Sequence, residues 1–290
     1  MRPLVILIRP VKVRMMRMST LRIIAAGFLI CLLVLTGCSS TKTPKSIVDK
    51  TLSAITQVKS FQLDTDFTDG AGDLWQGTKV VNVSDKEMGM NMAITMGPYI
   101  TISDEMYFMD GLEYCETISK ENSPQTFGWT KNALTNDVWS SEIQMPFFTE
   151  LLKTASKFSS MGTERLNNVD CYVLTVTPSA QASADFVFSQ GQPGGPAFYS
   201  PDIEGGYMVT PDLYYAGSIE LWVSQDDYLP LKVDAEFGFK QAKSNLPAAT
   251  TTSPIITNYH CELDFSNYNQ PASIQVPRDA LNAPLDNTVQ

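Results

Sequence analysis

The C-terminal third of the chain alternates apolar and polar residues with a period of two, and this pattern constrains the fold most. It is clearest over residues 219–224, 231–239 and 259–265. In the second of these segments, charged residues separate Leu231, Val233 and Ala235. Because successive side chains of a strand point to opposite faces, each segment is predicted to be a strand with one buried and one solvated face.

The same alternation predicts further strands upstream. They are expected at residues 61–67, 74–83, 87–96, 99–102, 105–109 and 113–118, with a later hairpin at 161–166 and 171–177. Asp110-Gly111 is a hairpin turn signal. Residues 119–144 are less regular, and there Trp129 and Trp139 are predicted to be anchors.

Three segments predict helices. The first begins at Pro44 with Thr43 as its N-cap, because proline fits the first helical position, and it carries an apolar stripe that includes Ile47 and Ile55. A second begins at Pro146, and a short third lies near residues 180–188. Many antiparallel strands with few helices predict an α+β domain, a strongly curved antiparallel β-sheet with helices closing its concave side.

One strand has an unusual apolar face. By alternation, a single face of residues 87–96 carries the candidate lining of a ligand cavity: Met88, Met90, Met92, Ile94 and Met96. Methionine is flexible and polarizable, so a row of them can repack around apolar ligands of different shapes. In the alternative interpretation these side chains simply pack on a helix, and one concave face can serve both purposes.

The N-terminus resembles a lipoprotein export signal. Six basic residues and no acidic residue accompany an apolar run at 23–35, too short for a membrane-spanning helix. Leu35-Thr36-Gly37-Cys38 resembles a bacterial lipobox, which implies that Cys38 is acylated and begins the mature chain. We therefore expect a signal peptide at 1–37 and a polar tether at 38–43. The alternative is an uncleaved anchor helix.

Such a signal implies an extracytoplasmic protein, anchored to the cell membrane or outer membrane by the lipid on Cys38. The signal carries six of the 21 basic residues and none of the 31 acidic ones, so the mature chain has a formal net charge of −16. Such an acidic chain repels nucleic acid, and we expect no nucleic-acid partner. We expect a monomer.

Three cysteines remain in the mature domain, namely Cys115, Cys171 and Cys261. They lack the close C-x-x-C spacing of a zinc site. Cys171 and Cys261 both fall in apolar strand faces, and we favour that pair for a disulfide, which an extracytoplasmic location permits. The alternative is three buried thiols.

The sequence carries no catalytic signature. His260, the single histidine, is expected on the solvated face of its strand, and no G-x-S-x-G, Walker A or H-E-x-x-H motif occurs. Asp64, Asp66 and Asp69 suggest a calcium loop, but their spacing does not match an EF-hand, and outward strand carboxylates beside a turn fit better. We predict no enzyme, no cofactor and no metal site.

A segment rich in glycine and proline, residues 189–213, is predicted to be a long loop, either a functional flap or an insertion.

The order of these elements resembles the LolA-like lipoproteins, which include the lipoprotein carrier LolA and the mycobacterial LppX/LprG group. Three stretches carry the resemblance: residues 47–66, residues 217–233 with Leu229-Pro230, and residues 263–277 with the sequence Tyr-Asn-x-Pro. The resemblance implies a half-barrel domain at 44–290, with an apolar cavity between sheet and helices that accepts the acyl chains of lipids or lipoproteins. A non-enzymatic interaction or sensory module on the same scaffold is the alternative.

Overall fold

The computed structural model describes residues 42–69, 72–97, 100–119, 125–190, 209–240 and 256–285. Residues from Thr43 onward form one compact unit. The predicted signal peptide, Cys38 and the centre of the predicted loop, residues 191–208, lie outside the described residues. Among the described helices, none has the length and apolar character needed to cross a membrane.

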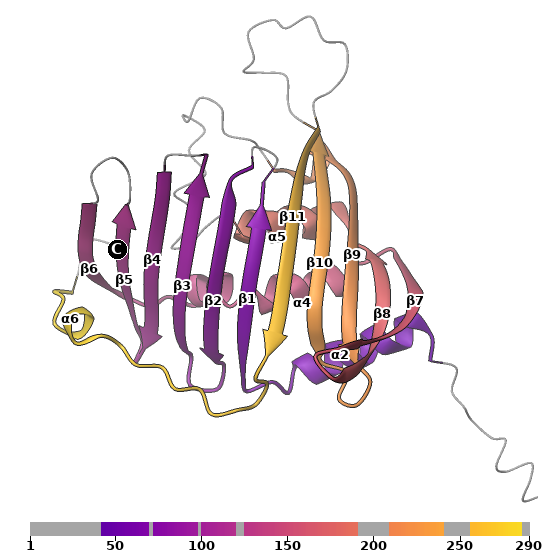
Figure 1. The fold of residues 1–290 in the computed structure, drawn as a ribbon, viewed down its shortest axis with the longest axis horizontal. Coiled ribbons are helices and arrows are strands. Elements are labelled where there is room, and N and C mark those ends of the chain that lie inside the picture. Colours follow the sequence, from indigo (N-terminus) through magenta and orange to yellow (C-terminus); the bar gives the residue numbers. More distant parts are fainter. Residues whose placement is uncertain are drawn as a thin grey trace, which may run out of the picture. The chain divides into compact units, whose positions relative to one another are not determined.

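A single open sheet of eleven strands organises this unit (Figure 1). Its strands are β1 (Ser60–Thr68), β2 (Leu74–Asn82), β3 (Glu87–Met96), β4 (Ile100–Met109), β5 (Leu112–Ser119), β6 (Gln125–Ala133), β7 (Lys157–Leu166), β8 (Val169–Thr177), β9 (Tyr214–Ser224), β10 (Pro230–Lys240) and β11 (Ile256–Ser266). Their order is β6-β5-β4-β3-β2-β1-β11-β10-β9-β8-β7, and all neighbours are antiparallel. The first and last strands therefore pair at the centre, and β6 and β7 form the two edges of the sheet, with an isolated bridge between Lys131 of β6 and Leu285.

Helices cover one face of the sheet, the inner face. They are α2 (Pro44–Ile55), α3 (Asn136–Glu142), α4 (Met145–Lys153), α5 (Ala180–Gln190) and the 3₁₀ turn η2 (Pro211–Leu213). The short α6 (Arg278–Leu281) instead lies beside β5 and β6 on the outer face, where the Leu281 carbonyl accepts from Lys131 of β6. Figure 1 shows α4 and α5 behind the strands. As predicted, α2 begins at Pro44, and the Thr43 hydroxyl accepts a hydrogen bond from the Ser46 amide at 3.2 Å. The curved antiparallel sheet with few helices confirms the predicted α+β class.

Two predictions about the chain between residues 99 and 144 were wrong. The segments expected as separate strands form one strand, β4, and Asp104 lies inside it with its side chain on the inner face. The irregular segment contains β6 and α3. Its tryptophans differ, because Trp139 is buried in the core whereas Trp129 lies on the outer face and contacts the ring of Tyr107.

Candidate ligand-binding site

The methionine row lies on the inner face of β3, as predicted. Met88, Met90, Met92 and Ile94 are at most 5% exposed, and Met96 packs against the same core from a partly buried position. Met90 stands between Lys79 of β2 and Met106 of β4 in the sheet register. These side chains therefore lie between the sheet and its cover in one continuous apolar core.

The cover over this row is α3, a seven-residue helix that the sequence analysis missed. The ring of Trp139 lies 6.1 Å from that of Phe108 on β4, whereas Glu142 contacts Lys79 on β2. Since β3 runs between β2 and β4, α3 spans the methionine row. The signal that could have found it is Thr135, whose hydroxyl accepts from the Val138 amide at 3.2 Å as an N-cap.

Glu142 and Lys79 form a buried ion pair between α3 and the sheet. Lys79 is 1% exposed and Glu142 is 2% exposed. The Lys79 Nζ donates to the Glu142 backbone carbonyl at 2.7 Å and lies 3.4 Å from its Oε2. Burial lowers the pKa of Lys79, and the charge and hydrogen bond of Glu142 oppose that shift. An ion pair withdrawn from water gains stability only while both partners stay in place.

More carboxylates than ammonium groups occupy this part of the inner face. Burial raises the pKa of Asp104, whose carboxylate accepts from the Thr117 hydroxyl at 2.6 Å. Burial, and then the charge of Glu142, also raise the pKa of Glu113. The pKa of the Cys115 thiol is raised to about 12 by burial and by both of these carboxylates. The inner face of β2 to β5 therefore carries both apolar and ionisable side chains.

Two further polar side chains on the inner face have no hydrogen-bond partner among the described residues. The Thr65 hydroxyl and the Trp75 indole nitrogen are buried and unpaired, and each side chain is 7% exposed. Trp75 and Lys79 occupy the inner positions on either side of Gly77 on β2, and Thr65 pairs directly with Gly77. A buried donor that makes no hydrogen bond costs free energy of folding. Both of these donors lie around Gly77, which has no side chain of its own.

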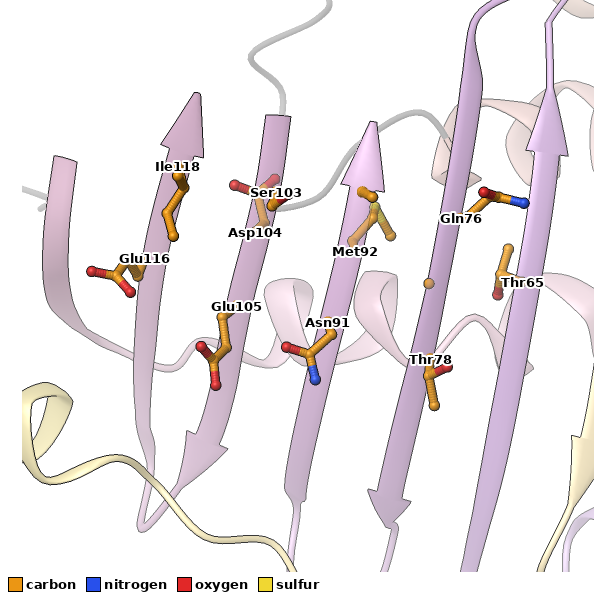
Figure 2. A pocket seen from close by; sticks show the side chains of 12 residues that line it. Thr65, Gln76, Thr78, Asn91, Met92, Ser103, Asp104, Glu105, Glu116 and Ile118 are labelled. Atoms are coloured by element: carbon orange, nitrogen blue, oxygen red, sulfur yellow. The ribbon is translucent and has the colours of Figure 1, made fainter. Parts of the chain in front are cut away.

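The outer face carries a hollow of about 510 Å³ over β2 to β5. Figure 2 shows the side chains that line it, among them Asn91 of β3, Glu105 of β4 and Glu116 of β5. Glu105 and Glu116 are directly opposite in the sheet register, and the Tyr107 hydroxyl donates to Glu105. Burial and Glu105 raise the pKa of Tyr107 to about 12. This hollow is polar and open to water, unlike the methionine row behind it.

A second hollow of about 490 Å³ lies at one end of β9 to β11 and includes His260. As predicted, His260 is on the outer face, where its Nε2 lies 3.0 Å from the Asp234 carboxylate. Asp64 and Asp66 also point outward and accept from Thr78 and Gln76 of β2. Within the described ranges, no group of histidine, cysteine and acidic side chains has the arrangement of a metal site.

The favoured disulfide between Cys171 and Cys261 was wrong. Both thiols are free, and so is Cys115. β9 and β10 separate the two strands, and Cys171 lies on the outer face whereas Cys261 lies on the inner face. Strands are about 4.8 Å apart, so the gap exceeds the roughly 6 Å that a disulfide spans between Cα atoms.

No protein-family model matches the sequence, and no curated protein matches it significantly. The structure is similar to the lipoprotein LppX of Mycobacterium tuberculosis, with 12% identity, a TM-score of 0.41, and 80% of this chain and 97% of that chain covered. It is similar to LprF of Mycobacterium bovis, with 10% identity, a TM-score of 0.45, and 81% and 99% covered. A DUF1329 family protein from Desulfovibrio piger has 11% identity, a TM-score of 0.27, and 81% and 96% covered.

Proposed function

We propose that this protein is an extracytoplasmic lipoprotein, anchored through acylated Cys38, that binds a lipid or another apolar molecule between the sheet and α3. The observation that carries the proposal is the methionine row under α3. Unbranched methionines repack at low cost, and a seven-residue helix forms a small cover. Burial of acyl chains against this face would supply the binding free energy, at about 25 cal/mol per Å² of apolar area.

Binding requires α3 to move, because the row is closed in this structure. The α3–α4 junction supports such a movement. Gln144 has a left-handed backbone with a φ of 57°, which is strained for a residue other than glycine. Its side chain is buried, and the amide oxygen accepts no hydrogen bond within the described part of the chain. Relief of this strain would offset part of the free energy of opening.

The full-length protein, extracted from membranes in mild detergent, tests the proposal by native mass spectrometry followed by organic extraction. We expect a stoichiometric lipid that remains bound in the mass spectrometer and is released by solvent. A protein without bound lipid, which also takes up none when lipid is added, would refute the function.

The anchor needs its own test. Cells fed a fatty acid with a terminal alkyne should label the wild-type protein and leave the Cys38→Ala variant unlabelled. Equal labelling of the two would show that the lipid is attached elsewhere. Because this experiment reports on covalent attachment alone, its outcome is independent of cavity binding.

A second candidate function is a protein-interaction or regulatory module on the same scaffold. The closed methionine row and the polar hollow on the outer face favour it. A lipid-free protein whose outer-face variants, such as Asn91→Arg, lose a partner captured by cross-linking in cells would support this function over lipid binding.

A further inference from the structure

The polar groups on the inner face of β2 to β5 suggest which class of lipid binds there, an inference that rests on the proposed function. Lys79 is a cation among apolar neighbours, with Leu63 of β1 and Met90 of β3 beside it in the register. Both of its hydrogen-bond acceptors belong to Glu142, the last residue of α3. The cover over the apolar row therefore also brings the anion that neutralises Lys79.

An acyl chain that enters the methionine row must displace α3, whose Trp139 ring lies 6.1 Å from Phe108 of β4, together with Ile143, which is buried in the same core. Glu142 is next to Ile143 in sequence, so the displacement draws the carboxylate away from Lys79. A lipid with a neutral polar end would then leave a buried ammonium group without a counterion, which is strongly unfavourable.

We infer that the ligand is an anionic lipid, whose carboxylate or phosphate takes the place of Glu142 on Lys79. The surrounding donors fit this role. The Thr65 hydroxyl and the Trp75 indole nitrogen are buried, have no partner in the part of the chain that the structure describes, and lie next to Gly77 on the same face. An anion at this point accepts hydrogen bonds from groups that otherwise have none.

Asp104 of β4 and Glu113 of β5 would favour a cationic ligand instead. The experiment therefore includes a cationic lipid probe. Three photoreactive probes carry the same alkyl chain and diazirine and differ only at the polar end: analogues of palmitate, hexadecanol and hexadecylamine. Each is added to membranes that contain the full-length protein, and peptide mass spectrometry locates the labelled residues after irradiation.

The palmitate probe should label the inner face of β2 and β3 about tenfold more than the hexadecanol probe, as expected for a charge-assisted hydrogen bond in a buried site. Equal labelling by these two probes, or stronger labelling by hexadecylamine, would overturn the inference and leave apolar binding intact. Labelling of the inner face by none of the probes would refute the proposed function itself.

Two variants sharpen the test. Glu142→Gln removes the competing carboxylate and should increase labelling by palmitate relative to hexadecanol. The double variant Lys79→Met, Glu142→Gln leaves no unpaired charge, so it should fold and label equally with both probes. A palmitate preference that survives in the double variant would overturn the role of Lys79.

Free anions provide the last control. Inorganic phosphate in large excess should leave labelling by the palmitate probe unchanged, because the alkyl chain supplies most of the affinity. Loss of labelling in phosphate would show a small-anion site and would overturn the assignment to a lipid.

Discussion

The two halves of the inner face are built differently. In β8 to β11 the inner positions hold branched aliphatic and aromatic side chains such as Leu174, Leu221 and Val233, which are completely buried. The ring centroid of Phe237 lies 5.6 Å from that of Phe186 on α5, with the two rings tilted by 46°. In β2 to β4 the corresponding positions include four methionines, a bare Gly77 and the charged Lys79, beside the rings of Trp75 and Phe108. Branched and aromatic side chains specify one packing arrangement, whereas methionines accept several. We interpret the first half as a scaffold and the second as the adaptable half.

The largest expected effect comes from breaking the scaffold half. Phe237→Ala removes a buried ring that contacts Phe186, and should lower the free energy of unfolding by about 3–5 kcal/mol. Urea unfolding of the full-length protein measures it. A loss below about 1 kcal/mol would mean that this half is no better packed than the other.

The next effect comes from the ion pair in the adaptable half. Lys79→Met leaves Glu142 buried without a counterion and should cost about 3 kcal/mol, the lower end of the range for broken buried pairs. The double variant Lys79→Met, Glu142→Gln should recover most of this loss in the same unfolding experiment. No recovery would show that Lys79 stabilises through packing rather than through its charge.

Replacing the flexible side chains should separate stability from binding. The double variant Met90→Leu, Met92→Leu nearly conserves volume, so stability should change by less than about 1.5 kcal/mol. The range of lipids that co-purify should become narrower, because leucine repacks less readily. An unchanged lipid profile would contradict the role of these two positions. Leu221→Met in the scaffold half is the matched control and should leave the profile unaltered.

The smallest effect depends on pH. The pKa of Asp104 is raised above its ordinary value of 3.8, so the folded protein binds this proton more tightly than the unfolded chain. Its contribution to stability is therefore present at low pH and is lost as the pH rises through the folded pKa. Asp104→Asn should raise the thermal midpoint at neutral pH and not below pH 3.8. A midpoint lowered at both pH values would show that the carboxylate is needed for its hydrogen bond to Thr117.

The scaffold half was the easier half to predict. Over residues 219–224, 231–239 and 259–265, alternation identified both the strands and their buried faces, because the inner positions in these ranges are apolar. In β4 the alternation of apolar residues is interrupted by Asp104 on the inner face, which lies between the two segments expected as separate strands. The cover α3 has seven residues, too few for a clear helical stripe.

Only one partner of the buried Lys79–Glu142 ion pair could be predicted from the sequence. Lys79 falls on the apolar side of its strand between Trp75 and Val81, so its inward position is readable from alternation. Its partner Glu142 is 63 residues away on a helix that local patterns did not reveal. The pairing depends on how α3 lies across β2 and β4, which is a property of the tertiary structure.

Hydrogen exchange of the full-length protein, with and without added palmitate, tests the adaptable half most directly. We predict that the amides of residues 134–144 exchange much faster than those of β9 and β10, and that palmitate slows them while β9 and β10 stay unchanged. Protection of residues 134–144 equal to that of β9 and β10, and unaffected by palmitate, would contradict the account.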